Sequence, residues 1–379
     1  MGSVVVVVFA SLALVALILV VAGAYRHSRG PVIAGTIVLA ALAVAWMAGL
    51  PGKSLPPART VWVDQSPHTV RMVQVAPDVQ LEVLDWGGSG PPLVFLSGLQ
   101  DVAHGFDDFA PQFNDRYHVL AITRRGYGAS SQPPSGYDVA TRVTDLVNVL
   151  DSLGLERVAL VGHSIAGDEL TAFAGVYPDR ASALVYLDAA YDHSDIVNLL
   201  TGSPPPPPML RADSVSPGAV QAWLLRSYGM RIPEAQLRAI GKYDATDHLV
   251  ANVTPPVIDS LMLAGVGHPD YAAVRAPALV IEAVIDSMPQ VFPNSRTFDS
   301  ATRAQAIRFT ATLQEWATTR SGRVARELQG AQMIGLHGAN HYVFDSNAAA
   351  PSKIRSSLAC PSSVISPTSS RNSVPVCAC

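Results

Sequence analysis

The sequence predicts an α/β domain with a mostly parallel β-sheet that is covered by helices on both faces. From residue 69 onward, short runs rich in Val, Ile and Leu alternate with stretches of helical spacing. The alternation stops between residues 191 and 275 and then resumes, and one apolar run leads directly into a glycine–serine turn. Strands that alternate with helices favour parallel β-α-β units, whose crossover helices lie on the sheet faces.

The individual elements follow this pattern in order along the chain. An opening strand pair is expected at 70–75 and 80–85, followed by strands at 92–97, 118–123, 158–161 and 183–187. Apolar residues recur at helical spacing between 137 and 153, and a second helix is expected at 165–177. Two further strands at 278–283 and 333–336 flank a long helical stretch at 301–328.

The interruption predicts an insertion between two strands of one sheet. Residues 191–275 contain a run of five prolines, Pro204–Pro208, and helical pieces at 219–228 and 233–240. The proline run favours a stiff polyproline connector. We therefore expect a helical cap inserted into a domain that spans residues 69–350.

Two uncharged apolar runs at residues 4–22 and 32–50 predict an N-terminal membrane anchor of two helices. Each run approaches the roughly 20 residues that a helix needs to cross a bilayer. A cleaved signal peptide is the alternative for the first run, but the N-terminus has no basic region. Residues 51–68 are expected to be a linker, with the large domain on the extracytoplasmic side because the short uncharged N-terminus is easy to translocate.

Composition limits the partners of the domain. The formal net charge of −4 gives no electrostatic reason to expect nucleic acid. All three cysteines lie after residue 359, and the sequence contains no phosphate-binding glycine loop, so neither a metal nor another cofactor is expected. The Ser- and Pro-rich residues 351–379 are expected to be a disordered tail.

The strongest chemical signal is the sequence GHSIAG at residues 162–167, which follows the apolar run 158–161 and precedes a helical stretch. A serine on a sharp strand-to-helix turn holds its hydroxyl above the edge of the sheet, and the strained turn requires small neighbours. Gly162 and Ala166 occupy these neighbouring positions. The pattern therefore predicts Ser164 as a nucleophile.

Residues 70–345 resemble the α/β-hydrolase family, in the group whose nucleophile turn reads GHSxAG. The sequence TRRGYGASS at 123–131 resembles the family's D-x-R-G-x-G-x-S loop, and GANHY at 338–342 resembles its G-x-x-H ending. Ser97 stands where the family usually has histidine, and Ala166 stands where the strict motif has glycine. The resemblance implies a serine hydrolase without a cofactor.

The family pattern implies the partners of Ser164. His341 follows the last expected strand, where the family places its base, whereas His337 lies at the strand end and His163 is expected to pack beside the nucleophile. The family order of Ser, acid and His favours Asp286 as the acid. Asp188, at the end of the preceding strand, is the second choice and Glu282 the third.

The same resemblance implies an oxyanion hole made by the backbone N–H groups of Leu99 and Ile165. The expected reaction is hydrolysis of a small-molecule or lipid-like carboxylic ester through an acyl-enzyme. An acyltransferase with the same triad is one alternative. A non-catalytic, membrane-tethered binding module is another, and an activated serine would distinguish an enzyme from it.

Overall fold

The computed structural model describes residue 36 and residues 62–195 and 199–359. The chain divides into two compact units, residues 1–64 and 65–379, and all the elements below belong to the second. Apart from Thr36, both expected membrane helices lie outside the described residues. Within the described part of the chain, no helix has the length and hydropathy needed to cross a membrane.

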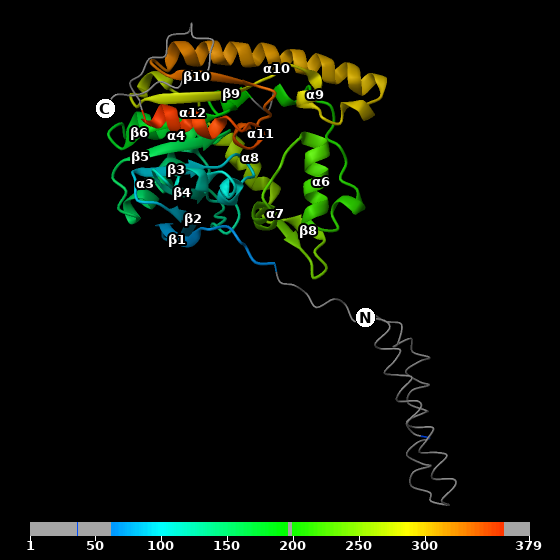
Figure 1. Ribbon diagram of the computed structural model, residues 1–379, viewed down its shortest axis with the longest axis horizontal. Coiled ribbons are helices and arrows are strands. Elements are labelled where there is room, and N and C mark those ends of the chain that lie inside the picture. The colour runs from blue at the N-terminus through cyan, green and yellow to red at the C-terminus, as the bar shows by residue number, and fades with distance from the viewer. Residues whose placement is uncertain (1–35, 37–61, 196–198, 360–379) are drawn as a thin grey trace, which may run out of the picture. The chain divides into compact units, whose positions relative to one another are not determined.

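The second unit is built on an eight-stranded sheet with the spatial order β1-β2-β4-β3-β5-β6-β9-β10 (Figure 1). β2 pairs antiparallel with both β1 and β4, whereas all the other neighbours are parallel. This arrangement confirms the expected mostly parallel sheet. The strands are β1 (Thr69–Ala76), β2 (Val79–Gly87), β3 (Pro92–Leu96), β4 (His118–Thr123), β5 (Val158–His163), β6 (Ala181–Leu187), β9 (Ala278–Val284) and β10 (Gln332–His337).

Alternate residues of each central strand contribute to two separate cores, one on each face of the sheet. On β5, Val158 and Leu160 belong to one core, and Ala159 and Val161 belong to the other. The first core is closed by α3 (Val139–Ser152), α4 (Ala166–Val176) and α10 (Ser300–Glu327). The second is closed by two short 3₁₀ turns, Ala103–Phe106 and Ala110–Phe113, together with α11 (Val343–Ser346) and α12 (Ala350–Ala359).

Local hydrogen bonds explain where the main helices begin. The Asp138 carboxylate accepts from the backbone N–H of Thr141 at 2.9 Å, and so caps the start of α3. Asp299 caps α10 in the same way through the N–H of Thr302 at 2.7 Å. Such caps satisfy backbone donors that have no partner within the helix.

The insertion lies between β6 and β9. It contains α6 (Pro217–Tyr228), α7 (Glu234–Ile240) and α8 (Pro256–Ala264), with a two-stranded antiparallel sheet of β7 (Gly241–Tyr243) and β8 (Leu249–Asn252) that the sequence analysis did not predict. After β9, the short helix α9 (Met288–Val291) leads into α10. In Figure 1, α10 runs alongside β10 and α6 lies to the side of the sheet. Residues of the insertion and of α10 line the cavity that contains Ser164.

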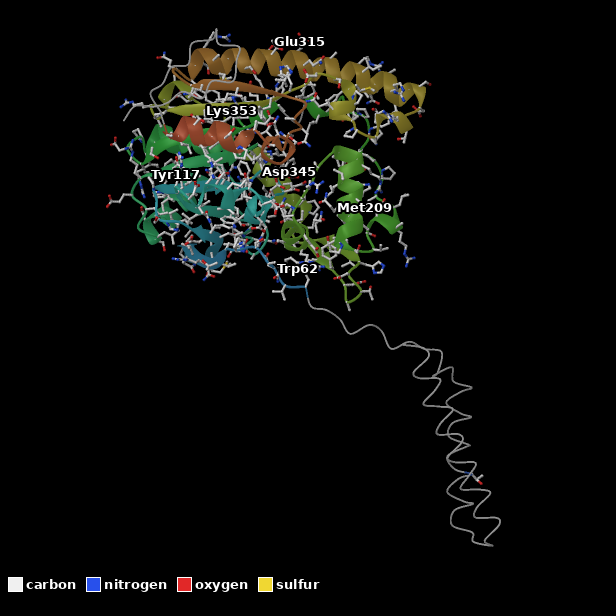
Figure 2. The ribbon with its side chains drawn as sticks, in the orientation of Figure 1. Trp62, Tyr117, Met209, Glu315, Asp345 and Lys353 are labelled. Carbon is white, nitrogen blue, oxygen red and sulfur yellow. The ribbon has the colours of Figure 1, made fainter. Side chains whose placement is uncertain are left out.

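The prediction that the chain is disordered from residue 351 is wrong for the first part of this tail. Residues 350–359 form α12, in which Ala350 and Ile354 are buried against the sheet and Leu358 packs beside them. Lys353 lies on the exposed side of this helix (Figure 2). The three apolar residues are spaced four apart and form one stripe, which the Ser-rich composition obscured.

The close approach of α4 to the chain after β6 gives a prediction about Gly167. A Cβ at Gly167 would lie 1.8 Å from the carbonyl oxygen of Ala189. We expect Gly167→Ala to lower the free energy of unfolding by about 1–3 kcal/mol, because overpacking forces the backbone apart. Gly267→Ala is the control, since a Cβ there meets nothing within 4 Å. Urea unfolding of both variants measures the difference, and equal stability would contradict the prediction.

Candidate active site

Ser164 lies on a strained turn between β5 and α4. Its φ angle is 53°, which non-glycine residues rarely adopt, and its side chain is buried among the strand ends. A Cβ at Gly162 would lie 2.7 Å from a methyl group of Leu170 and 3.1 Å from the Cβ of Ala166. The small residues that the sequence analysis required are therefore needed by the packing around the turn.

The structure brings His341 and Asp188 together at the edge of the sheet. The Nδ1 atom of His341 lies 2.8 Å from Oδ2 of Asp188, a hydrogen-bonding distance. Asp188 directly follows β6, and its backbone is also strained, with a φ of 44°. Its N–H donates to the carbonyl of Ile281 on β9 at 2.7 Å. The main chain of Asp188 is therefore held by β9, while its carboxylate is held by its side-chain partners.

The first-choice acid of the sequence analysis, Asp286, lies elsewhere. Its carboxylate is partly exposed and contacts Nδ1 of His337 at 2.9 Å. The strand register explains this pairing, because β10 aligns His337 with Val284, two residues before Asp286. The loop after β10 carries His341 on towards the end of β6. The second choice, Asp188, is therefore the acid that contacts His341, and the preference for Asp286 is corrected.

The third candidate acid, Glu282, also has other partners. Its side chain accepts a hydrogen bond from the Ser321 hydroxyl at 2.6 Å, and burial raises the pKa of its carboxyl group. His163, which the sequence analysis expected to pack beside the nucleophile, is fully buried, and its Nε2 lies 3.0 Å from the backbone oxygen of His341. It therefore helps to position the loop that carries His341.

A buried arginine balances the charge of Asp188. Nη2 of Arg320, from α10, lies 2.7 Å from Oδ1 of Asp188, and both side chains are only 9% exposed. Burial alone would raise the pKa of Asp188, but the charge of Arg320 and the contact with His341 outweigh it and hold the pKa below its ordinary value. The Cζ atom of the Arg320 guanidinium also lies 4.7 and 4.6 Å from the ring centroids of Tyr191 and Trp316, two rings that pack edge to face against each other.

The two residues expected to supply the oxyanion donors belong to the cavity that contains Ser164. Leu99 and Ile165 both line this cavity. Within the described part of the chain, the backbone N–H groups of these two residues have no hydrogen-bond acceptor. Ile165 also stands at the N-terminus of α4, where the helix dipole favours negative charge. Both donors are therefore free to bind a developing oxyanion.

Arg124 orients the loop that carries one of these donors. Its guanidinium donates to the carbonyl oxygens of Ser97 and Gly98 at 2.7 and 2.8 Å. The C=O of Gly98 and the N–H of Leu99 belong to one trans peptide and point in opposite directions. Binding of the Gly98 oxygen by Arg124 therefore turns the Leu99 N–H away from the arginine.

The charge of Arg124 is compensated inside the protein. Its Nε donates to Oε1 of Glu169 on α4 at 3.0 Å, and Arg142 on α3 donates to the same oxygen at 2.8 Å. All three side chains are at least 90% buried. The ion pair of Arg124 and Glu169 links the loop of Leu99 to α4, the helix that begins after Ser164. It therefore fixes the positions of the two expected donors relative to each other.

Ser164, Asp188 and His341 line one cavity of about 470 Å³. The Ser164 hydroxyl lies 3.4 Å from the Tyr191 hydroxyl, and within the described residues no hydrogen bond joins it to the His341 ring. Catalytic hydrogen bonds are commonly loose without substrate. The apolar wall comes from the insertion, from the segment after β9 and from α10, and consists of Leu199, Leu200, Met230, Leu263, Ile285, Val291, Leu313 and Trp316.

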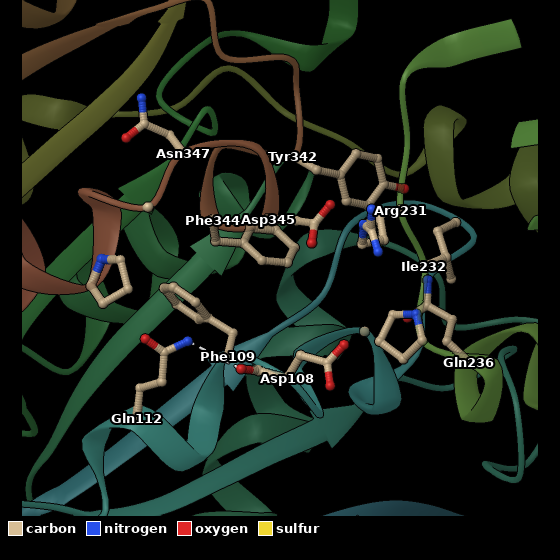
Figure 3. A pocket seen from close by; sticks show the side chains of 14 residues that line it. Asp108, Phe109, Gln112, Arg231, Ile232, Gln236, Tyr342, Phe344, Asp345 and Asn347 are labelled. Atoms are coloured by element: carbon tan, nitrogen blue, oxygen red, sulfur yellow. Dashed lines mark hydrogen bonds between the residues drawn. The ribbon is translucent and has the colours of Figure 1, made fainter. Parts of the chain in front are cut away.

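A second, smaller pocket of about 270 Å³ lies between the start of α7 and the segment after His341 (Figure 3). The side chains of Arg231 and Asp345 lie close together in its lining, and Tyr342 lines both this pocket and the cavity that contains Ser164. The Tyr342 hydroxyl lies 3.1 Å from both carboxylate oxygens of Asp101. Neither Ser164 nor His341 is among the described residues that line this smaller pocket.

Sequence reasoning missed three residues of the site: Arg124, Tyr191 and Arg320. Arg124 carried a detectable signal, since a second basic residue beside Arg125 at the end of a buried strand needs an internal partner. Arg320 carried none, because it lies in a long polar helix with several other arginines. Only the packing of α10 near the end of β6 brings Arg320, and not another arginine of the helix, into contact with Asp188.

Comparison with known proteins agrees with the observed fold. The model of the alpha/beta hydrolase fold family matches residues 91–315, more than half of the chain. The chain therefore belongs to the α/β-hydrolase fold family, as the nucleophile turn and the sheet order indicated.

Several relatives are about one-third identical in sequence to the chain, but each match covers only a segment of about 100 residues. A 2-(acetamidomethylene)succinate hydrolase from Mesorhizobium japonicum is 30% identical over 101 residues, 27% of this chain and 36% of its own. Epoxide hydrolase A from Mycobacterium tuberculosis is 36% identical over 113 residues, 29% of this chain and 35% of its own. A fluoroacetate dehalogenase from a Burkholderia species is 35% identical over 107 residues, 27% of this chain and 35% of its own. The chain thus spans about a third of each of these relatives, of which two are hydrolases and one is a dehalogenase by name.

Solved structures show the same fold at low identity. The crystal structure of an E-2-(acetamidomethylene)succinate hydrolase matches with a TM-score of 0.54 and 20% identity, over 77% of this chain and 99% of the other. A membrane phospholipase A described as a bacterial virulence factor matches with a TM-score of 0.51 and 18% identity, over 78% and 87% of the two chains. At this identity the likeness supports the fold alone.

The two carboxylates give a direct test of the acid. We expect Asp188→Asn to lower kcat by about 10⁴-fold, because an amide cannot hold the imidazole in the required tautomer or stabilise its charged form. Asp286→Asn is the matched control and should stay within about threefold of wild type. Steady-state hydrolysis of a p-nitrophenyl ester measures both, and the opposite order of effects would restore Asp286 as the acid.

Removal of Arg320 should destabilise the protein in a pH-dependent way. Arg320→Met leaves a buried carboxylate without its cation, which costs about 3–5 kcal/mol near pH 7. The pKa of Asp188 lies below its usual 3.8 in the folded protein, so its ionisation stabilises the fold above pH ~4 and this contribution is lost at lower pH. The difference between wild type and variant should therefore shrink as the pH falls below about 4.

The measurement is urea unfolding of both proteins at pH 7 and pH 3. Arg326→Met serves as the control, because Arg326 lies on the exposed side of the same helix. A destabilisation by Arg320→Met that is equal at the two pH values would mean that Arg320 acts only through packing.

Proposed function

We propose that the protein is a serine hydrolase that cleaves carboxylic esters through an acyl-enzyme. The single observation that carries the proposal is the contact between Asp188 and His341 at the rim of the cavity that also holds Ser164. A nucleophile on a strained turn, a histidine and a buried carboxylate are the groups that acyl transfer to serine requires.

Each group has a defined role in the proposed reaction. Ser164 attacks the ester carbonyl, and His341 takes the serine proton and returns it to the leaving alcohol. Asp188 holds the Nδ1–H of His341 and stabilises the imidazolium that forms. Water then attacks the acyl-enzyme with His341 as the base, which releases the acid and restores Ser164.

The developing oxyanion is bound by the N–H groups of Leu99 and Ile165. In related sites, one such donor lowers the barrier by about 3–4 kcal/mol. The buried bridge of Arg124 and Glu169 supports this role, because donors fixed before the reaction need no reorganisation during it.

The cavity favours a substrate with an apolar portion. Leucine, isoleucine, methionine and tryptophan side chains form most of its wall, and its volume of about 470 Å³ is typical of pockets for small molecules. Each CH₂ group moved from water into this wall contributes about 0.8 kcal/mol to binding. The proposed substrate is a small-molecule or lipid-like ester.

The nucleophile type distinguishes this proposal from the activities of some relatives. Epoxide hydrolases and dehalogenases of this fold are expected to use an aspartate as the nucleophile. The corresponding turn of this chain carries Ser164 instead. Acyl transfer to an acceptor other than water would use the same three residues and is the second candidate. A non-catalytic binding module is the alternative from a different class.

We also propose that the runs at 4–22 and 32–50 anchor the domain to a membrane, on its extracytoplasmic side. The support comes from the sequence, since each run is uncharged and about as long as a bilayer-spanning helix. Such an anchor would keep the cavity near lipid-like esters.

Labelling with a fluorophosphonate probe tests the proposed nucleophile. We expect the full chain, purified in detergent, to react with the probe, since an activated serine attacks phosphorus as it attacks an ester carbonyl. Ser164→Ala should abolish labelling and His341→Ala should slow it by at least about 10³-fold.

Ser287→Ala is the control, because Ser287 is exposed on the loop after β9 and should be dispensable. Circular dichroism spectra verify that each variant is folded. A folded wild type that does not react with the probe would favour the non-catalytic binding module.

A further inference from the structure

A second histidine–aspartate pair lies beside the candidate active site. Nδ1 of His193, a few residues after β6, is 2.8 Å from Oδ1 of Asp168 on α4. The two side chains are only 2% and 3% exposed. The proposed reaction uses neither residue, and the sequence analysis singled out neither.

The pair is incompletely satisfied. Within the described residues, the Nε2 atom of His193 is buried without a hydrogen-bond partner, and the same is true of Oδ2 of Asp168. Buried polar atoms without partners are rare in folded proteins, because they lose hydration and gain nothing in return. An unpartnered imidazole nitrogen on a residue that also lines a cavity is therefore a candidate contact for a ligand.

The position of His193 suggests which ligand that is. His193 lines the same cavity as Ser164, Asp188 and His341. Its ring lies 4.1 Å from the ring of Tyr191, and the Tyr191 hydroxyl lies 3.4 Å from the hydroxyl of Ser164. Only one aromatic side chain thus separates His193 from the nucleophile, so a group bound to His193 belongs to the substrate, close to the ester bond.

The chemistry of the pair defines what it can bind. A carboxylate can only accept hydrogen bonds, so Asp168 requires the proton of the imidazole on Nδ1. The neutral ring then presents Nε2 as an acceptor. An acceptor in an apolar cavity selects a ligand with a hydroxyl or N–H donor and discriminates against the analogue that lacks it.

We propose that His193, oriented by Asp168, binds a hydroxyl or N–H group of the substrate near the ester bond. This inference rests on the proposed function and narrows its substrate class from apolar esters to apolar esters that carry one hydrogen-bond donor. His193 is a specificity residue, and the proton transfers of the reaction remain with His341.

Pairs of esters that differ by one hydroxyl group test the inference. The acyl side is probed with p-nitrophenyl butanoate against its 2-hydroxy and 3-hydroxy analogues, and the alcohol side with propyl butanoate against 2-hydroxypropyl and 3-hydroxypropyl butanoate. We expect wild type to favour the hydroxylated ester in at least one pair by about tenfold in kcat/KM, the effect of one hydrogen bond to a buried acceptor.

Three variants connect this preference to the pair. His193→Phe removes the acceptor and should reduce the preference to within about twofold, whereas His193→Gln keeps an acceptor oxygen and should retain part of it. Asp168→Asn allows the imidazole to carry its proton on Nε2, and should also weaken the preference. His248→Gln, at a partly exposed histidine in the insertion, is the control and should leave the preference unchanged.

Labelling by the fluorophosphonate probe shows that each variant has a folded site, and it separates the possible failures. Labelled wild type with no preference in any pair overturns this inference alone, and so does a preference that His193→Phe leaves intact. An unlabelled, folded wild type overturns the proposed function and this inference together. Equal losses for both members of every pair would mean that His193 only supports the fold.

Discussion

The candidate site depends on one buried carboxylate, that of Asp188. Its two oxygens contact Arg320 on one side and His341 on the other, at 2.7 and 2.8 Å. A buried anion without a cation is strongly unfavourable, so the position of Arg320 on α10 and the path of the loop after β10 are both constrained by this group. The strained backbone of Asp188 lies between two strands that hold it in place, which is how such strain is tolerated.

The same principle operates on the opposite side of Ser164. Glu169 on α4 accepts from Arg124 and Arg142, and Arg124 in turn holds two carbonyl oxygens of the loop before Leu99. Buried ions on this side orient backbone dipoles, whereas on the Asp188 side they orient an imidazole. In both cases a charge far from solvent acts through fixed geometry, because the surroundings cannot reorient to screen it.

The parts of the site that are local in sequence could be predicted, and the parts that depend on long-range packing could not. The turn at Ser164 is encoded by six consecutive residues, so the strand, the serine and the helix were all expected in place. The acid was assigned to Asp286 because it follows β9, but the register of β10 gives that carboxylate to His337. Likewise, α12 was missed because its three apolar residues stabilise the helix only when they are buried against the sheet.

By itself, the sequence determined the alternation of strands and helices, the existence of an insertion after β6, and the residue at the strained turn. These features follow from residue periodicity and from the small side chains that a sharp turn requires. The tertiary structure decided which carboxylate meets His341, which arginine balances it, and that His193 and Asp168 share the cavity with Ser164. Those contacts join residues up to 153 positions apart, and only the order of strands in the sheet brings them together.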